Sequence, residues 1–327
     1  MKISVGMLVF LALQPFASAG ESGHPAAVSA TLSLPWAKVL PGVPFDMIVT
    51  MRNDSAQTAA VGISARLIVI LPDGTRFAPA AYHRLEPDLP AERDQNFVEL
   101  APGKSRQFAV TWWNFWPNWS HYDDYASPGQ YEIALELGAS NTPQNYVGSI
   151  TTNTARLERA VPHGEDEALW KRMQAIKQCG MMYSTTPPRQ ICHGGWPDDG
   201  FASLKEGVAL AREIRDLHPA SQYYPYAILM QFRHDSSDLP KAMDAAERFP
   251  DSPAHPYLLI LAAEYALSEL NQANRRHDSA GTDKYLSLAD DLYAKAIAEP
   301  LNVSALEWAR RGLAIVRESR AMRAAAH

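Results

Sequence analysis

The densest group of chemistry-bearing side chains is an aromatic run between positions 112 and 125. Four of the eight tryptophans fall in it, interleaved with Asn, His and Asp. Flat aromatic faces stack on a sugar ring or a peptide, and neighbouring amides and carboxylates fix the orientation of such a ligand. The residues that this interpretation assigns to ligand contact are Trp113, Phe115, Trp116, Trp119, His121, Tyr122, Asp123 and Asp124.

The same run has a second interpretation, which is the more common use of such residues. A loop rich in Pro, Trp and Tyr can fold over the strands or dock on the helices that follow. His121, Asp123 and Asp124 have donor types suited to a divalent cation, but no defined ligand loop surrounds them. The sequence therefore predicts no metal and no cofactor, and it leaves ligand contact and packing both open.

Only two cysteines, Cys179 and Cys192, occur in the chain. In an oxidising compartment such a lone pair is expected to form a disulfide. A loop of that size contributes about 3 kcal/mol to stability in the chain-entropy description. A zinc site would need two further ligands, and a redox role usually needs Cys-x-x-Cys spacing. The pair is therefore predicted to be a structural disulfide.

Short motifs of the common enzyme classes are missing from the sequence. It contains no Gly-x-Ser-x-Gly, no His-Glu-x-x-His, no Gly-x-Gly-x-x-Gly and no Walker loop. Because catalytic triads assemble from distant residues, this lowers the expectation of catalysis without excluding it. The carboxylates on which an enzyme could draw include Asp123, Asp124, Asp198 and Asp199.

The first nineteen residues have the composition of an export signal. Lys2 precedes an apolar run from Ile3 to Leu13, and small residues occupy positions 17 to 19. A positive start, a short apolar core and a small-residue end are typical of a cleaved secretory signal. Residues 1–19 are therefore predicted to be a signal peptide, and the mature protein is expected to be periplasmic or secreted.

Residues 25–160 read as short strands. In segment 45–51 the residues at odd positions are apolar, and Asp46 lies on the opposite face of the expected strand. In segments 107–112 and 131–137 every second residue is likewise apolar. A period of two is typical of strands with one face in a core. Further β-rich runs lie at 28–34, 61–71, 96–100 and 146–157, separated by Pro-Gly and Asp-Gly turns. About seven short strands in this length indicate an antiparallel β-sandwich.

Residues 164–325 read as helices. Prolines at 219, 240, 250, 256 and 300 mark breaks between them. Four apolar stripes at helical spacing are predicted to face a core. Their members are Leu169, Trp170, Met173 and Ile176; Phe201, Leu204, Val208, Ala211, Ile214 and Leu217; Tyr285, Leu288, Leu292 and Ala296; and Leu306, Ala309, Leu313 and Val316.

Two segments of the first half carry a family resemblance. The segments are 100–105 (Leu-Ala-Pro-Gly-Lys-Ser) and 127–133 (Ser-Pro-Gly-Gln-Tyr-Glu-Ile). Their order resembles the last strands of bacterial immunoglobulin-like domains, including those similar to the BsuPI proteinase-inhibitor domain. The resemblance implies an immunoglobulin-like sandwich and says little about function.

A second resemblance lies in the helical half. The segment 245–250 (Ala-Ala-Glu-Arg-Phe-Pro) resembles the second helix of a tetratricopeptide repeat. The resemblance implies a stack of antiparallel helical hairpins, although Pro250 and Pro300 are fifty positions apart rather than thirty-four.

Charge and hydropathy limit the function classes. The net charge is −6 and no basic stripe occurs, which argues against a nucleic-acid partner. No segment after the signal is apolar enough to span a bilayer. We therefore expect an exported, non-catalytic binding or scaffold protein that recognises a protein, peptide or glycan in the cell envelope. The alternative is an envelope hydrolase or glycan-processing enzyme with an accessory β-sandwich domain.

Overall fold

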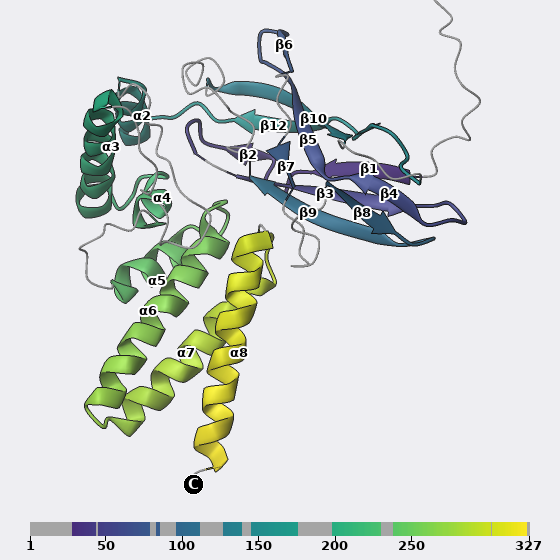
Figure 1. Ribbon diagram of the computed structural model, residues 1–327. Helices are drawn as coiled ribbons and strands as arrows, with labels where there is room; N and C mark the ends of the chain where they lie inside the picture. The colour runs from purple at the N-terminus through teal and green to yellow at the C-terminus, as the bar shows by residue number, and fades with distance from the viewer. Residues whose placement is uncertain are drawn as a thin grey trace, which may run out of the picture.

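A computed structural model describes residues 28–43, 45–78, 83–85, 96–111, 127–138, 145–175, 198–229, 238–301 and 303–325. Strands occupy the first half of the chain and helices the second, as the sequence predicts, and the helices lie beside and below the strands in Figure 1. The last strand ends at Arg159 and the first described helix begins at Glu165.

The strands in the described part of the chain form three sheets. Their bounds are β1 (Val28–Ser33), β2 (Lys38–Val39), β3 (Asp46–Asn53), β4 (Ala59–Gly62), β5 (Ser64–Ile70), β6 (Arg76–Phe77), β7 (His83–Arg84), β8 (Phe97–Leu100), β9 (Ser105–Thr111), β10 (Gly129–Gly138), β11 (Ile150–Thr151) and β12 (Ala155–Arg159). One sheet has the order β1-β3-β9, another β2-β12-β10-β5-β6 with β7 and β11 attached, and β4 pairs with β8. The strands pair antiparallel except β2 with β12.

Period-two burial confirms the strand predictions. Tyr131, Ile133, Leu135 and Leu137 of β10 have no exposed surface. The odd positions of β3 are likewise buried, and the inward side chains of the sheets belong to one apolar core. Removing apolar surface from water stabilises a fold by about 25 cal/mol per Å². A strand with one apolar face gains this stabilisation only when that face packs against another apolar face.

The run 61–71 was predicted as one strand and is two. Residues 59–62 form β4, paired with β8, whereas 64–70 form β5, paired with β10. Ile63 lies between them with no exposed surface. Its backbone N–H donates to Asn96 O and its carbonyl accepts from Leu85 N, so the break between the strands keeps its backbone hydrogen bonds.

Two asparagines join segments that pair in different sheets. The amide of Asn153 bonds both backbone groups of Leu32 in β1, with Leu32 N to Asn153 Oδ1 at 2.8 Å and Asn153 Nδ2 to Leu32 O at 3.1 Å. Buried Asn53 donates to the carbonyls of Gln57 at 2.8 Å and Leu100 at 2.7 Å. Buried backbone groups must be hydrogen-bonded. Here the asparagine side chains supply the hydrogen bonds that a neighbouring strand would otherwise supply.

The helical half contains α2 (Glu165–Ala175), α3 (Asp198–Leu217), α4 (Tyr224–Leu229), α5 (Leu239–Arg248), α6 (His255–Arg275), α7 (Ser279–Ile297) and α8 (Val303–Ala325). Each of α4 to α8 packs against the next, and α6, α7 and α8 lie side by side in Figure 1. Pro240 and Pro256 occupy the first turns of α5 and α6, where the missing N–H costs nothing. The other three prolines lie between helices, as predicted.

Most described members of the apolar stripes are buried or half-buried. Leu217 is an exception, and the prediction is wrong there: its side chain is 70% exposed. Leu217 is the last residue of α3, where the chain turns toward α4 and none of the described elements covers it. Ile176 and the side chains of Phe201, Leu204 and Val208 lie outside the described residues.

In the described ranges, none of the helices combines the length and the apolar character needed to cross a membrane.

Candidate functional site

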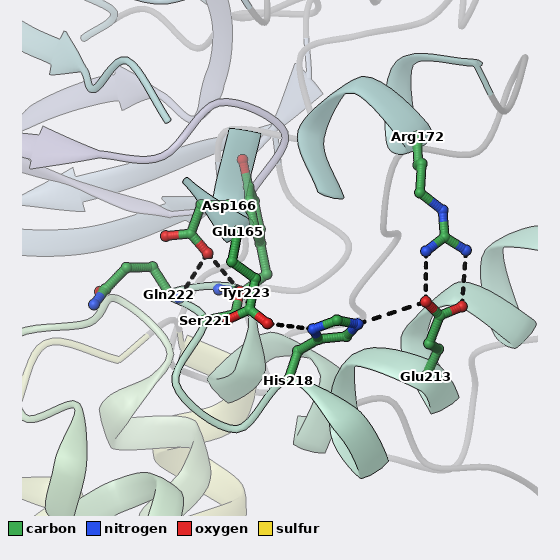
Figure 2. A network of polar contacts seen from close by, with 8 residues as sticks. All are labelled: Glu165, Asp166, Arg172, Glu213, His218, Ser221, Gln222 and Tyr223. Carbon is green, nitrogen blue, oxygen red and sulfur yellow. Dashed lines mark hydrogen bonds and ion pairs between the residues drawn. The ribbon is translucent and has the colours of Figure 1, made fainter. Parts of the chain in front are cut away.

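A network of polar side chains lies where the first helices meet the strands. Figure 2 shows that its members come from α2, from the end of α3 and from the turn that leads into α4. They are Glu165, Asp166, Arg172, Glu213, His218, Ser221, Gln222 and Tyr223. The sequence places three acids, 165–167, in the first turn of α2, where the helix dipole favours negative charge.

His218 lies between two carboxylates. Its Nδ1 contacts Glu165 Oε1, and its Nε2 lies 3.5 Å from Glu213 Oε1. Both terminal nitrogens of the Arg172 guanidinium also donate to Glu213, Nη1 to Oε1 at 2.5 Å and Nη2 to Oε2 at 2.8 Å. A bidentate pair of this kind is directional, so it fixes the orientation of α2 against α3.

The hydrogen bonds from Arg172 lower the pKa of Glu213 from 4.5 to about 2, and the charges of Arg172 and His218 add to this effect. Burial raises the pKa of Glu213 and is the second-largest influence on it, but the hydrogen bonds from Arg172 outweigh this effect. Glu213 therefore stays ionised across the physiological pH range, as a partner for Arg172.

Asp166 holds the turn that precedes α4. Its Oδ1 accepts from Ser221 Oγ at 2.6 Å and from the backbone N–H of Gln222 at 3.1 Å. The Ser221 hydroxyl in turn accepts from Tyr223 N at 3.0 Å. Ser221 is only 2% exposed, so these bonds satisfy a buried hydroxyl that would otherwise destabilise the turn.

The turn reaches the β half through Tyr223. This side chain has no exposed surface, and its hydroxyl donates to the carbonyl of Pro41 at 3.2 Å. Pro41 and Gly42 form a turn after β2 that is itself buried. Gly42 has a φ of +76°, a conformation that disfavours side chains with a Cβ. The α4 segment therefore packs on a strand-connecting turn.

A second bond joins the two halves through different elements. The hydroxyl of Tyr257 in α6 donates to the carboxylate of Asp46, the first residue of β3. Asp46 is 1% exposed and Tyr257 is 8% exposed. Strand alternation placed Asp46 on the solvent side, and that prediction is wrong because α6 covers this end of the strand.

The chemistry of the network is that of a structural junction. Both ring nitrogens of His218 face carboxylates, and the Ser221 hydroxyl bonds to Asp166. A general base that activates a serine needs a ring nitrogen directed at that hydroxyl. Among the described residues, no cluster of three or more His, Cys, Asp or Glu side chains is arranged to hold a metal ion.

None of the site residues predicted from the sequence belongs to this network. The aromatic run 112–125 and the cysteines at 179 and 192 are outside the described residues, as are the signal segment and the side chains of Asp198 and Asp199. The sequence did not predict that residues 165–166 contact residues 213–221, or that Asp46 bonds to Tyr257. The available signals were the acidic start of the helix at 165–167 and the acid Asp46 in an otherwise apolar strand. Neither signal indicates which residue is the partner.

Comparisons with known proteins identify no family. No protein-family model matches the sequence, and no curated protein matches it. Among solved structures, the sporulation control protein Spo0M of Bacillus subtilis aligns with a TM-score of 0.27 and 12% identity. That alignment covers 46% of this chain and 56% of Spo0M, so the chain spans about half of that protein.

Two further structures are similarly distant. The alkylpurine DNA glycosylase AlkC of Pseudomonas fluorescens, bound to DNA, aligns with a TM-score of 0.28 and 12% identity over 42% of this chain and 32% of AlkC. The CARDB domain of the PF1109 protein of Pyrococcus furiosus, in complex with di-metal ions, gives 0.22 and 12% over 41% of this chain and 94% of that domain. Likenesses of this size carry no argument about function.

Proposed function

We propose that the chain is an exported, non-catalytic binding or scaffold protein that recognises a protein, peptide or glycan in the cell envelope. The proposal includes a signal peptide at 1–19, an immunoglobulin-like sandwich at 25–160 and a tetratricopeptide-like helical stack at 164–325. The antiparallel strand pairing and the consecutive packing of α4 to α8 support this finer description of the fold.

The observation that carries the proposal is the double attachment of the helices to the strands. Tyr223 and Tyr257 come from separate helical segments. They bond to Pro41, in the turn before β3, and to Asp46, the first residue of β3. Two buried hydrogen bonds at separate points resist rotation of one half against the other. A fixed arrangement lets loops on one half and helices on the other present a single preformed surface, which reduces the entropy lost on binding.

The polar network supports the same function. Its histidine, serine and carboxylates are engaged with one another and with backbone groups that hold α2, α3 and α4 together. The alternative is an envelope hydrolase or glycan-processing enzyme, and cleavage of a glycan usually needs two carboxylates roughly 5–10 Å apart across a cleft. No contact between described carboxylates favours that alternative over the binding function.

The aromatic run provides the test, since a binding surface there needs free aromatic faces. The experiment measures thermal melts of Trp116→Ala and Trp119→Ala, and then capture of envelope proteins and glycans by the wild-type and variant chains. Ligand contact predicts unchanged melts and binding weakened by about 1–3 kcal/mol. Tyr285→Ala, a deletion of a half-buried aromatic ring on α7, is the control for nonspecific loss of capture.

Packing of the run between the halves predicts the reverse result. Each tryptophan deletion would then lower stability by about 3–5 kcal/mol, the usual effect of emptying an aromatic site. That outcome removes the run from the binding surface. Hydrolysis of an envelope polymer by the purified mature chain would overturn the proposed function itself.

A further inference from the structure

The outer face of α8 is unusually apolar for an exposed surface. Ile315 is 53% exposed and Met322 is 62% exposed, and they are two of the six large apolar residues that are exposed in the described part of the chain. They are seven positions apart, so they lie on one face of the helix two turns from each other. The small residues Ala314 and Ala321 lie beside them on the same face, and both are exposed.

The opposite face holds α8 firmly against its neighbours. Ala309 and Val316 have no exposed surface. The indole of Trp308 donates to Glu264 Oε1 at 2.7 Å, and the hydroxyl of Tyr293 donates to the same oxygen. On the flank, Arg317 and Arg320 both bond to Asp290 of α7. The outer face is therefore presented on a fixed helix whose own packing is already satisfied.

Two opposite charges lie on this outer face. Arg311 and Glu318 are both exposed and are also seven positions apart, on the same side as Ile315. Neither forms a hydrogen bond or an ion pair with another described residue, and at this spacing they are too far apart to bond each other along the helix. With no partner among the described residues, each charge can meet an opposite charge of another chain.

We propose that this face of α8, formed by Arg311, Ala314, Ile315, Glu318 and Met322, pairs with the same face of a second copy of the chain, the two helices running antiparallel. In a symmetric dimer a surface meets itself. With the twofold axis between positions 314 and 315, Ile315 lies beside Ala314 of the second copy. Arg311 then lies beside Glu318 of the second copy, and Glu318 beside its Arg311.

The charge pattern selects this arrangement over the alternatives. A parallel pairing would place Arg311 against Arg311 and Glu318 against Glu318, and like charges at an interface oppose association. A partner of one charge sign would satisfy only one of the two groups, whereas a second copy satisfies both. One helix face from each chain buries less than the roughly 800 Å² per partner of a standard interface, so the dimer is weak and salt-sensitive.

Sedimentation velocity over a range of protein concentrations tests the pairing. The wild-type chain is expected to dimerise reversibly, and more weakly as salt rises. Arg311→Glu and Glu318→Arg should each weaken dimerisation at least about tenfold, because each places like charges together. The double variant R311E/E318R restores both pairs and should dimerise within about threefold of wild type. Mixing the two single variants should give a heterodimer.

Matched changes elsewhere serve as controls. Arg76→Glu on β6 and Glu247→Arg on α5 alter exposed residues by the same charges and should leave dimerisation unchanged. Circular dichroism should show that all variants keep the wild-type fold. Ile315→Lys gives an independent test, because it places a charge at the axis and should abolish the dimer.

Three results would overturn the proposal. The first is a wild-type chain that stays monomeric at all concentrations. The second is a dimer that none of the α8 variants weakens, since another surface would then form it. The third is a monomer that binds vesicles of phosphatidylglycerol and phosphatidylethanolamine through Ile315 and Met322, which would assign this face to lipid.

Discussion

The hydroxyl of Tyr257 in α6 donates a hydrogen bond to the carboxylate of Asp46 in β3, and both side chains are buried. The two residues are 211 positions apart. A buried carboxylate destabilises a fold unless hydrogen bonds replace its water, so this contact joins the two halves at a point where either half alone would be less stable.

Tyr257→Phe removes the donor and keeps the ring. The variant should lose about 1–3 kcal/mol of unfolding free energy, because a buried carboxylate then has one hydrogen bond fewer. Urea unfolding followed by circular dichroism measures the loss. Tyr285→Phe is the control: Tyr285 is half-buried and its hydroxyl bonds to no described residue, so the change should affect stability little. Equal stabilities for the two variants would show that the bond contributes nothing.

Arg172→Met should make stability depend differently on pH. The pKa of Glu213 is lowered from 4.5 to about 2, chiefly by Arg172. A lowered pKa stabilises the fold above about pH 4.5, and this contribution disappears as pH falls through about 2. Because Arg172 is half exposed, we expect a loss of about 0.2–1 kcal/mol at pH 7 and almost none near pH 2.

Urea midpoints at the two pH values measure this loss, and titration of the Glu213 carboxyl by NMR should show its pKa rising toward 4.5. Arg76→Met removes the same charge from an exposed residue of β6 and should show no such pH dependence. An identical loss at pH 7 and pH 2 would mean that Arg172 acts through packing and not through Glu213.

Gly312→Ala in α8 should destabilise the protein. Alanine normally favours a helix over glycine by about 1 kcal/mol. Here a Cβ would overlap the ring of Tyr293 in α7, which has no exposed surface. Overpacking of this kind lowers stability by about 1–3 kcal/mol, so the sign of the change is the test. A rise in melting temperature would show that the ring moves aside freely.

Cys179 and Cys192, outside the described residues, stay a predicted disulfide. Mass spectrometry of exported, unreduced protein should find no free thiol, and Cys179→Ser should lower stability by about 2–4 kcal/mol. Two cysteines that react with an alkylating reagent in native protein would contradict the pairing. The measurement also bears on export, because a reduced pair is typical of the cytoplasm.

The sequence alone determined the order of the two halves, with strands first and helices second, and the apolar face of several elements. Alternation in 131–137 predicted a strand that is buried on one face, and the stripe of Ala309 and Val316 predicted the inner face of the last helix. Proline positions predicted most helix boundaries. These signals are local: the period of apolar residues follows from the geometry of a single strand or helix, whatever covers it.

Only the tertiary structure decided which element covers which. Asp46 reads as a solvent-facing strand residue, yet α6 buries it. Pro41 and Gly42 read as a turn between strands, and nothing in that signal predicts that Tyr223 packs on the turn. His218 meets Glu165 across 53 positions of sequence. The spacing of apolar residues indicates which face of a helix or strand is apolar. The type of a polar residue does not indicate its partner, so contacts between polar residues of different elements are known only from the packed structure.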